Sequence, residues 1–288
     1  MEPVFKNDPA VTARFAVIGH PVAHSKSPLI HNSAFRLLSL NAAYGLLDTD
    51  EAALPDTVKR MINEPYTGWN VTMPCKTRMS ELCDEISVEA RIARAVNTVS
   101  NRNGHLYGDT TDGKGFLFAL ATMGISVENE KLTLLGGGGA ASAMLITSAL
   151  AGAREIAVFC RSARSAERVQ DVAARIAEAS SCRITLHDMA DTHDLKVQIA
   201  DSIALANGTS AGMHPADEET PVPADCLAAS CAVFDAVYNP LETRLLRGAT
   251  AAGCPTANGL QMLVGQAAES FKIWTGLDMP TDLLPPLV

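Results

Sequence analysis

The chain has 288 residues, of which 47% are hydrophobic and 19% are charged, and its net charge is −9. This composition excludes a disordered chain and is sufficient for a substantial core, with a length that suggests about two domains. The acidic balance argues against nucleic acid or an anionic membrane surface as the main partner, and it leaves a small anionic ligand open.

Location and metal content are predicted from what the sequence lacks. The first fifteen residues do not have the order of a signal peptide, and no apolar run reaches the roughly 18 residues of a membrane span, so we expect a cytoplasmic protein. The seven cysteines are scattered and form no CxxC pair, which is typical of reduced core thiols. His20 and His24 are separated by a loop-forming proline, and no metal site is predicted.

Short β-branched runs alternate with helical stretches in the first third of the chain. Strands are predicted over 14–19, 42–49 and 68–73, and helices over 27–40, 51–64 and 76–86. Such alternation is typical of an α/β fold with a mainly parallel sheet. The rhythm breaks over 95–108, where Asn103-Gly104 between two extended runs predicts a β-hairpin.

A second series of elements begins near residue 114. It opens with a predicted helix over 113–124, and strands of the length that suits a buried sheet follow over 131–136, 154–161, 183–188, 202–210 and 231–238. We therefore predict an α/β domain over 1–113 and a Rossmann-type, doubly wound domain over 114–259. A C-terminal helix over 260–288 is predicted to complete the first domain.

The segment "KLTLLGGGGAASAMLITSALAG" carries a glycine loop between a strand and a helix. Gly136, Gly138 and Ala141 follow the GxGxxA order that a dinucleotide-binding turn requires, and the helix after it would face a pyrophosphate with its N-terminus. We predict cofactor contacts at Gly136, Gly138, Gly139 and Ala140. The alternative is that the glycines form only a turn.

The end of the next strand predicts which dinucleotide binds. An acidic residue there would bind the ribose of NAD, whereas arginine accommodates the 2′-phosphate of NADP. Arg161, Ser162 and Arg164 occupy this position and no acid occurs before Glu167, so NADP is favoured and NAD stays possible. The alternative is a solvated turn before a surface helix.

Eight segments in a fixed order carry a resemblance to a known family. They are "GHPVAHSKSPLIHN", "NVTMPCK", "AVNTV", "GDTTDGKGF", "LLGGGGAAS", "NGTSAGM", "DAVYNP" and "NGLQMLVGQAAESF". Over about residues 14–276 the chain resembles the shikimate dehydrogenase family, including its quinate/shikimate branch. The resemblance implies a substrate-binding catalytic domain over 1–113 with 260–288, and an NADP-binding domain over 114–259.

The resemblance also implies a catalytic pair, Lys76 at the end of "NVTMPCK" and Asp112 in "TDG". Oxidation of a secondary alcohol by hydride transfer needs a group that takes the hydroxyl proton and returns it in the reverse direction. Either Lys76 or Asp112 transfers that proton, and Lys76 can alternatively act as an oriented donor to the oxygen.

Substrate contacts are implied for the serines of "HSKSP", Ser25 and Ser27, whose neutral hydroxyls suit the carboxylate of a small polyol acid. The same segment also fits a helix N-cap followed by proline. The other substrate contacts implied by the resemblance are Thr72, Asn97, Tyr238 and Gln266. At the nicotinamide end it implies Thr209, Gly259 and Met262.

The predicted function is NADP-dependent, reversible hydride transfer between 3-dehydroshikimate and shikimate in aromatic amino acid biosynthesis. A broader quinate/shikimate or aminoshikimate dehydrogenase that uses NAD or NADP is one alternative, and a non-catalytic dinucleotide sensor is another. The predicted partner is a small-molecule substrate, shikimate or quinate, and the predicted state is a monomer or homodimer.

Overall fold

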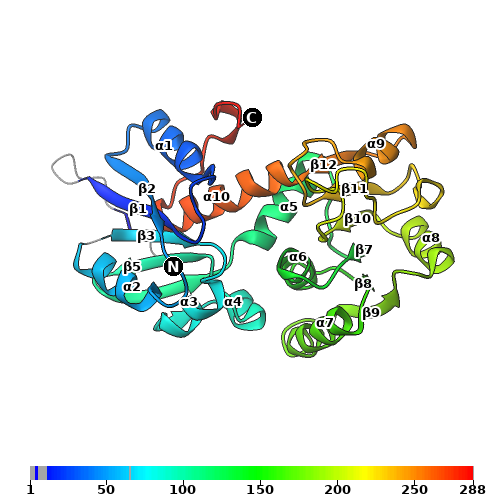
Figure 1. Ribbon diagram of the computed structural model, residues 1–288, viewed down its shortest axis with the longest axis horizontal. Helices are drawn as coiled ribbons and strands as arrows, with labels where there is room; N and C mark the ends of the chain where they lie inside the picture. Colours follow the sequence, from blue (N-terminus) through cyan, green and yellow to red (C-terminus); the bar gives the residue numbers. More distant parts are fainter. Residues whose placement is uncertain (1–3, 6–11, 65, 288) are drawn as a thin grey trace. The chain divides into compact units, whose positions relative to one another are not determined.

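The computed structural model describes residues 4–5, 12–64 and 66–287, which form two compact units. The first unit comprises Met1–Thr111 and Gln266–Val288, and the second comprises Asp112–Gly265. Figure 1 shows the elements of each unit. The functional roles assigned to the two parts of the chain stay predictions.

The first unit contains a mixed six-stranded sheet in the order β2-β1-β3-β5-β6-β4. Its strands are β1 (Ala13–Gly19), β2 (Ala42–Asp48), β3 (Tyr66–Val71), β4 (Glu85–Ile86), β5 (Thr98–Arg102) and β6 (His105–Asp109). β1 runs parallel to β2 and β3, and β5 runs antiparallel to β3 and β6. The predicted hairpin is confirmed as β5–β6, and its turn residues Asn103 and Gly104 have φ of 54° and 94°.

The helices of the first unit are α1 (Ser27–Leu37), α2 (Leu54–Asn63), α3 (Lys76–Leu82), α4 (Val88–Ala93) and the C-terminal part of α10 (Gly259–Thr275). The predicted helix over 76–86 is wrong beyond Leu82, and the C-terminal helix predicted over 260–288 is wrong beyond Thr275, where α10 ends. Cys83 is extended, and the backbone of Asp84 donates to the carbonyl of Leu106 at 2.9 Å. The chain there joins the sheet edge as β4 because this pairing satisfies its backbone groups.

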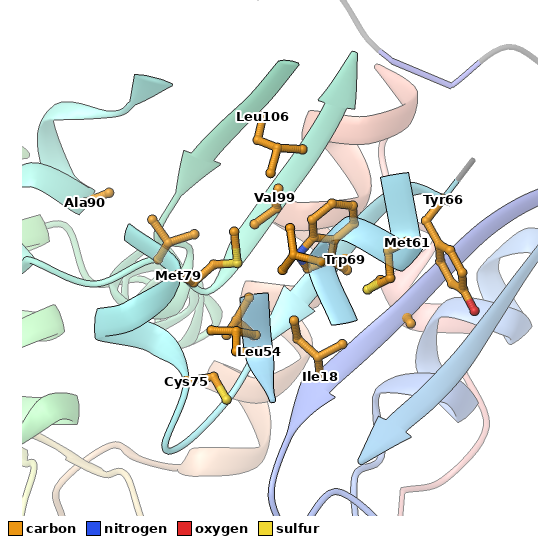
Figure 2. Close-up of a cluster of buried hydrophobic side chains, with 14 residues drawn as sticks. Ile18, Leu54, Met61, Tyr66, Trp69, Cys75, Met79, Ala90, Val99 and Leu106 are labelled. Carbon is orange, nitrogen blue, oxygen red and sulfur yellow. The ribbon is translucent and has the colours of Figure 1, made fainter. Parts of the chain in front are cut away.

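One face of the first sheet packs on α2 and α3. Leu54 and Met61 of α2, Trp69 of β3 and Met79 of α3 are each 0% exposed, as is Val99 of β5. Figure 2 shows these side chains in one buried cluster. Burial of apolar surface of this extent is the main source of the unit's stability.

The other face of the sheet is covered by α1 and α10 through aromatic side chains. The ring centroids of Phe15 and Trp274 lie 4.9 Å apart, and those of Phe35 and Phe271 lie 5.5 Å apart. The indole of Trp274 donates to the carbonyl of Val99 at 3.0 Å. Residues from the C-terminus therefore complete the core of the N-terminal unit.

The second unit contains a fully parallel six-stranded sheet in the order β12-β11-β10-β7-β8-β9. Its strands are β7 (Lys131–Leu135), β8 (Glu155–Cys160), β9 (Arg183–Asp188), β10 (Ala204–Asn207), β11 (Ala232–Asp235) and β12 (Thr256–Asn258). Numbered within the unit, this is the Rossmann order 3-2-1-4-5-6. The predicted doubly wound α/β class is thereby confirmed.

The helices of the second unit are α5 (Asp112–Thr122), α6 (Gly139–Leu150), α7 (Ala163–Ile176), α8 (Thr192–Ala200), α9 (Arg244–Ala251) and the start of α10. The predicted strands over 202–210 and 231–238 end earlier, at Asn207 and Asp235, because the chain turns at the carboxyl edge of the sheet. All seven cysteines are free thiols. In the described part of the chain, no helix has the length and apolar character to cross a bilayer.

Candidate active site

Several predicted substrate residues follow strand ends at one edge of the first unit's sheet. Ile18 of β1 pairs with Val71 of β3 in parallel, so both strands end at this edge. β5 is antiparallel and begins here, since Thr98 pairs with Asn70 of β3. The loops that leave β1 and β3 and the loop that enters β5 therefore converge on the same edge.

Lys76 is the first residue of α3 and is half-buried. The turn before it is closed by the Cys75 amide, which donates to the carbonyl of Thr72 at 3.0 Å. The carbonyl of Lys76 accepts from the Val96 amide at 3.0 Å, which ties the start of α3 to the segment that bears Asn97. Asp112 is half-buried and begins α5 in the second unit, and its pairing with Lys76 stays a prediction.

The carboxamide of Asn97 is held in one orientation. Its Oδ1 accepts from the backbone amide of Thr111 at 2.8 Å and from the hydroxyl of Thr98 at 2.9 Å. A flipped amide would place its NH₂ group against the Thr111 N–H, where two donors would meet. The Nδ2 donors of Asn97, which is 3% exposed, therefore point away from this cluster.

The two predicted carboxylate ligands lie at the start of α1. Ser27 is its buried first residue, and Ser25 is half-buried with an Oγ that accepts from the Ser27 amide at 3.3 Å. Ser27 also has a side-chain hydrogen bond with the Tyr44 phenol. Both the helix-start interpretation and the hydroxyl-donor interpretation of this segment are compatible with the geometry.

An exposed ion pair ties the loop after β1 to the end of β2. Nδ1 of His20 lies 2.6 Å from Oδ1 of Asp48, and the Val22 amide donates to the same carboxylate at 3.4 Å. The hydrogen bond and the charge of Asp48 raise the pKa of His20, and the hydrogen bond with His20 lowers the pKa of Asp48. This pair fixes the first part of the loop that leads to Ser25.

The predicted substrate residues divide between the units. Ser25, Ser27, Thr72, Lys76, Asn97 and Gln266 belong to the first unit, and Asp112 and Tyr238 to the second. Gln266 is buried in α10, and Thr72 is partly buried at the end of β3. Tyr238 follows β11 and is 41% exposed.

The glycine loop joins β7 to α6 in the second unit. Gly136 has φ of +105°, and a Cβ there would lie 2.9 Å from the Thr209 side chain. A Cβ on Gly138 or Gly139 would meet nothing within 4 Å, and no side chain caps α6 at Gly138. The loop thus offers exposed, uncapped amides at a helix start, which fits the pyrophosphate of a dinucleotide. Ala140, in the first turn, is exposed as well.

A buried polar cluster lies beside this loop at the ends of β10 and β11. Asn207 Oδ1 accepts from the hydroxyl of Thr209 at 2.7 Å, and its Nδ2 donates to Asp235 Oδ1 at 2.9 Å. Asp235 also accepts from the Thr243 hydroxyl at 2.7 Å and from the Val237 amide at 3.1 Å. The predicted cofactor residue Thr209 is therefore held by a network anchored on a fully buried carboxyl group.

The start of α10 supplies the other two residues predicted for the nicotinamide end. Gly259 is buried, and a Cβ there would lie 2.0 Å from the carbonyl oxygen of Ala236. Only glycine allows this approach between the helix start and the end of β11. Met262 is partly buried in the first turn of α10.

A cavity of about 310 Å³ lies at the carboxyl ends of β8 and β9. It is lined by Cys160, Arg161, Ser162, Ala163, Ala166, Leu186, His187 and Asp188. Ser162 caps α7 by accepting from the Ser165 amide at 3.3 Å. Arg164 is exposed and is not among the lining residues, so the structure places Arg161 and Ser162, but not Arg164, at this cavity.

Five polar residues that lie in or next to these sites were not predicted from the sequence to have a role. Asn70, Asn207 and Asp235 lie within the quoted segments "NVTMPCK", "NGTSAGM" and "DAVYNP", so a closer account of buried polar groups in those segments could have found them. Asp188 is the last residue of a predicted strand, and that position is a signal that could have identified it. Ser270 of α10 has no local sequence signal.

The parallel sheet in Rossmann order and the exposed glycine loop define a dinucleotide-binding α/β protein. Residues 17–99 match the family model of the shikimate dehydrogenase substrate binding domain, and residues 259–284 match that of the shikimate 5'-dehydrogenase C-terminal domain. The chain is 39% identical to shikimate dehydrogenase (NADP(+)) of Alkaliphilus metalliredigens over 96% of both chains. It therefore belongs to the shikimate dehydrogenase family.

Solved structures agree with this membership. A shikimate 5-dehydrogenase from Listeria monocytogenes in complex with shikimate and NAD has a TM-score of 0.91 at 39% identity, with 95% of each chain covered. A quinate dehydrogenase from Corynebacterium glutamicum in complex with NAD has a TM-score of 0.84 at 28% identity, with 95% of this chain and 97% of that chain covered.

Proposed function

We propose that the protein catalyses the NADP-dependent interconversion of shikimate and 3-dehydroshikimate in aromatic amino acid biosynthesis. The observation that supports this most is the content of the sheet edge in the first unit. Hydroxyls and amides converge there with Lys76, and a set of mostly neutral donors suits a small acid that carries several hydroxyls. Cytoplasmic location and a monomeric or homodimeric state also stay predictions.

The roles of the residues follow from their chemistry. Ser25 and Ser27 donate to the substrate carboxylate, whereas Thr72, Asn97, Gln266 and Tyr238 orient the ring and its other groups. Lys76 and Asp112 hold and transfer the proton of the reacting hydroxyl. When bound, the nicotinamide cofactor supplies the acceptor for the hydride that leaves the same carbon.

The second unit supplies the residues that would hold the cofactor. The amides around Gly136, Gly138, Gly139 and Ala140 would bind the pyrophosphate, and Arg161 and Ser162 would bind the 2′-phosphate in the adjoining cavity. Thr209, Gly259 and Met262 would lie toward the nicotinamide. Arg164 stays a prediction for the phosphate.

The test is nicotinamide absorbance after mixing the protein with shikimate or quinate and with NADP⁺ or NAD⁺. Rapid reduction with shikimate and NADP⁺ is expected, and slow reduction in the other mixtures. Comparable or faster reduction with quinate would replace the proposal by the broader quinate/shikimate alternative. Cofactor binding without reduction in any mixture would favour the sensor.

A lysine variant tests the chemical role of Lys76. Lys76→Met keeps the length of the side chain and removes the ammonium group, so kcat is expected to fall by about 10³ with a much smaller change in shikimate KM. The matched control is Lys59→Met on the exposed face of α2, which should leave both constants unchanged. A normal kcat for Lys76→Met would remove Lys76 from the chemistry.

One observation favours NAD as a second cofactor. Asp188, at the end of β9, lines the same cavity as Arg161, and its carboxylate can accept a hydrogen bond from a ribose hydroxyl of NAD. Arg161→Ala is expected to raise the KM for NADP⁺ on the order of tenfold and to leave the KM for NAD⁺ nearly unchanged. An equal change for both cofactors would show that Arg161 does not read the 2′-phosphate.

A further inference from the structure

Ser270 lies in the part of α10 that belongs to the first unit, and its side chain is completely buried. Its hydroxyl donates to the backbone carbonyl of Gln266, one helical turn earlier, at 2.9 Å. This bond uses the one proton of the hydroxyl. The oxygen of Ser270 is therefore left to act as an acceptor for other groups.

Three groups from the sheet lie within hydrogen-bond distance of that oxygen, and each threonine hydroxyl has one proton to give either to Ser270 or to Asn97. Nδ2 of Asn70 lies 2.9 Å from it, the hydroxyl oxygen of Thr98 lies at 2.8 Å, and that of Thr111 lies at 3.2 Å. The two threonine hydroxyls also reach Oδ1 of Asn97, at 2.9 Å and 3.2 Å. Ser270 thus shares its donors with the carboxamide that the substrate site presents.

The same network also reaches Ser27, one of the residues predicted to bind the substrate carboxylate. Oδ1 of Asn70 accepts from the phenol of Tyr44 at 2.7 Å, and that phenol is hydrogen-bonded to Ser27. One continuous chain of neutral groups, Ser27–Tyr44–Asn70–Ser270, therefore reaches both Gln266 and, through the threonines, Asn97.

We propose that Ser270 is a positioning residue of the substrate site, whose oxygen fixes the hydroxyls of Thr98 and Thr111 and thereby sets the Asn97 carboxamide with Nδ2 toward the substrate. This inference rests on the proposed function. Ser270 itself is completely buried and acts through its partners. Its removal leaves Asn70 and the two threonines with one acceptor fewer, so the hydroxyls beside Asn97 lose their fixed arrangement and the carboxamide is held less firmly, chiefly by the Thr111 amide.

The test is a pair of variants on the same helix. Ser270→Ala removes the shared acceptor, and Thr275→Val removes an equivalent back-bond, from Thr275 Oγ1 to the carbonyl of Phe271 at 2.8 Å. Thr275 is also buried, and its side-chain hydrogen bonds lie outside the Asn97 network. The pair therefore separates loss of a helix back-bond from loss of the network.

Ser270→Ala is expected to raise the KM for shikimate about tenfold, with kcat and the KM for NADP⁺ changed less than about threefold. Thr275→Val is expected to keep all three constants within about twofold. Equal KM changes in the two variants, or an unchanged KM in Ser270→Ala, would overturn the proposal.

A second variant and a second readout cover the remaining outcomes. Thr98→Val removes the threonine hydroxyl of the network on β5 and leaves helix α10 unchanged. It is expected to raise the KM for shikimate as Ser270→Ala does, and it replaces that variant if Ser270→Ala does not fold. The ¹⁵N–¹H signals of the Asn97 side chain, assigned by their loss in Asn97→Asp, should shift in Ser270→Ala and not in Thr275→Val.

The spectroscopic readout separates this inference from the proposed function. If the wild-type protein does not oxidise shikimate, the proposed function fails, and the Asn97 signals still decide whether Ser270 sets the amide. Unchanged Asn97 signals in both variants would overturn the inference even in an active enzyme.

Discussion

The two units bury polar groups in opposite ways. In the first unit, the hydroxyls of Thr98, Thr111 and Ser270 and the amides of Asn70 and Asn97 form a network without formal charge. In the second, Asp235 gathers its donors on an ionisable carboxyl group. Both networks lie directly behind predicted ligand-binding residues.

Burial acts differently on the ionisable groups of the two units. His31 in the first unit is fully buried, and neither ring nitrogen has a hydrogen-bond partner in the described part of the chain. Burial lowers its pKa to about 3, so the ring is neutral. Burial raises the pKa of Asp235, and hydrogen bonds from Thr243, Val237 and Asn207 oppose that rise. A histidine can thus be buried as a neutral ring, whereas an ionised carboxylate requires donors.

The largest expected loss of stability comes from a substitution that breaks the network of the second unit. Asp235→Ala leaves the donors of Asn207, Thr243 and Val237 without an acceptor in a buried site, and we expect a loss of about 3 kcal/mol in the free energy of unfolding. Urea unfolding followed by circular dichroism measures it. Both tryptophans, Trp69 and Trp274, lie in the first unit, so their fluorescence separates the response of that unit.

Asp235→Asn is the control for this loss. Its Oδ1 can accept from Asn207 and Val237, and its NH₂ group can donate to Thr243, so the expected loss at pH 7 is about 1 kcal/mol or less. Because the pKa of Asp235 is raised, its contribution to stability falls as pH rises through the folded pKa. A loss in Asp235→Asn as large as that in Asp235→Ala would show that charge, and not satisfied hydrogen bonds, matters here.

The next effect concerns the neutral histidine of the first unit. With a folded pKa of about 3 and an ordinary value of 6.5, His31 binds a proton in the unfolded chain first, so stability is lost as pH falls from 6.5 toward 3. Between pH 7 and pH 5 this loss is about 2 kcal/mol. His31→Leu should remove that part of the pH dependence, measured by urea unfolding at both pH values. An unchanged pH dependence would contradict a depressed pKa at His31.

A smaller effect sharpens the description of the first network. Tyr44→Phe removes one neutral donor from Oδ1 of Asn70 and keeps the aromatic stack with His31, whose centroid lies 4.4 Å away. We expect a loss of about 1 kcal/mol in the free energy of unfolding, read by tryptophan fluorescence. A loss as large as that of Asp235→Ala would mean that the neutral network is as sensitive as the one built on a carboxyl group.

The smallest effect is expected at the exposed pair of His20 and Asp48. Asp48→Asn removes the charge and weakens the hydrogen bond that raise the pKa of His20, so this pKa should fall toward 6.5 in an NMR titration. Solvent screens the pair, and unfolding should hardly change. The raised pKa gives stability below pH 6.5 that is lost as pH rises through the folded pKa. An unshifted His20 in the variant would show that the pair does not form.

Local signals made much of the second unit predictable. The strand over 131–136, the glycine loop and the following helix are contiguous, and each has its own hydrophobic or conformational signature. The NG turn of the β5–β6 hairpin has the same local character. In contrast, β4 has only two residues, and nothing in its own sequence shows that it pairs with β6.

The candidate site was predictable only in part. Lys76, Asn97 and the serines were found through motifs, but Ser270 lies 200 residues from Asn70 and 172 from Thr98 in the chain. Contacts at such separations are created by tertiary packing, and a serine inside an amphipathic helix has no local mark that distinguishes it. The buried supports of a site are therefore harder to predict than its ligands.

The course of α10 has a consequence for the order in which a ribosome produces a foldable chain. The helix begins in the second unit and continues into the first from Gln266, where it supplies the buried Phe271 and Trp274. All of Asp112–Gly265 is synthesised before these side chains exist. The N-terminal unit, although most of it is translated first, therefore cannot complete its core until the whole second unit has been synthesised, which departs from the usual vectorial order of domains.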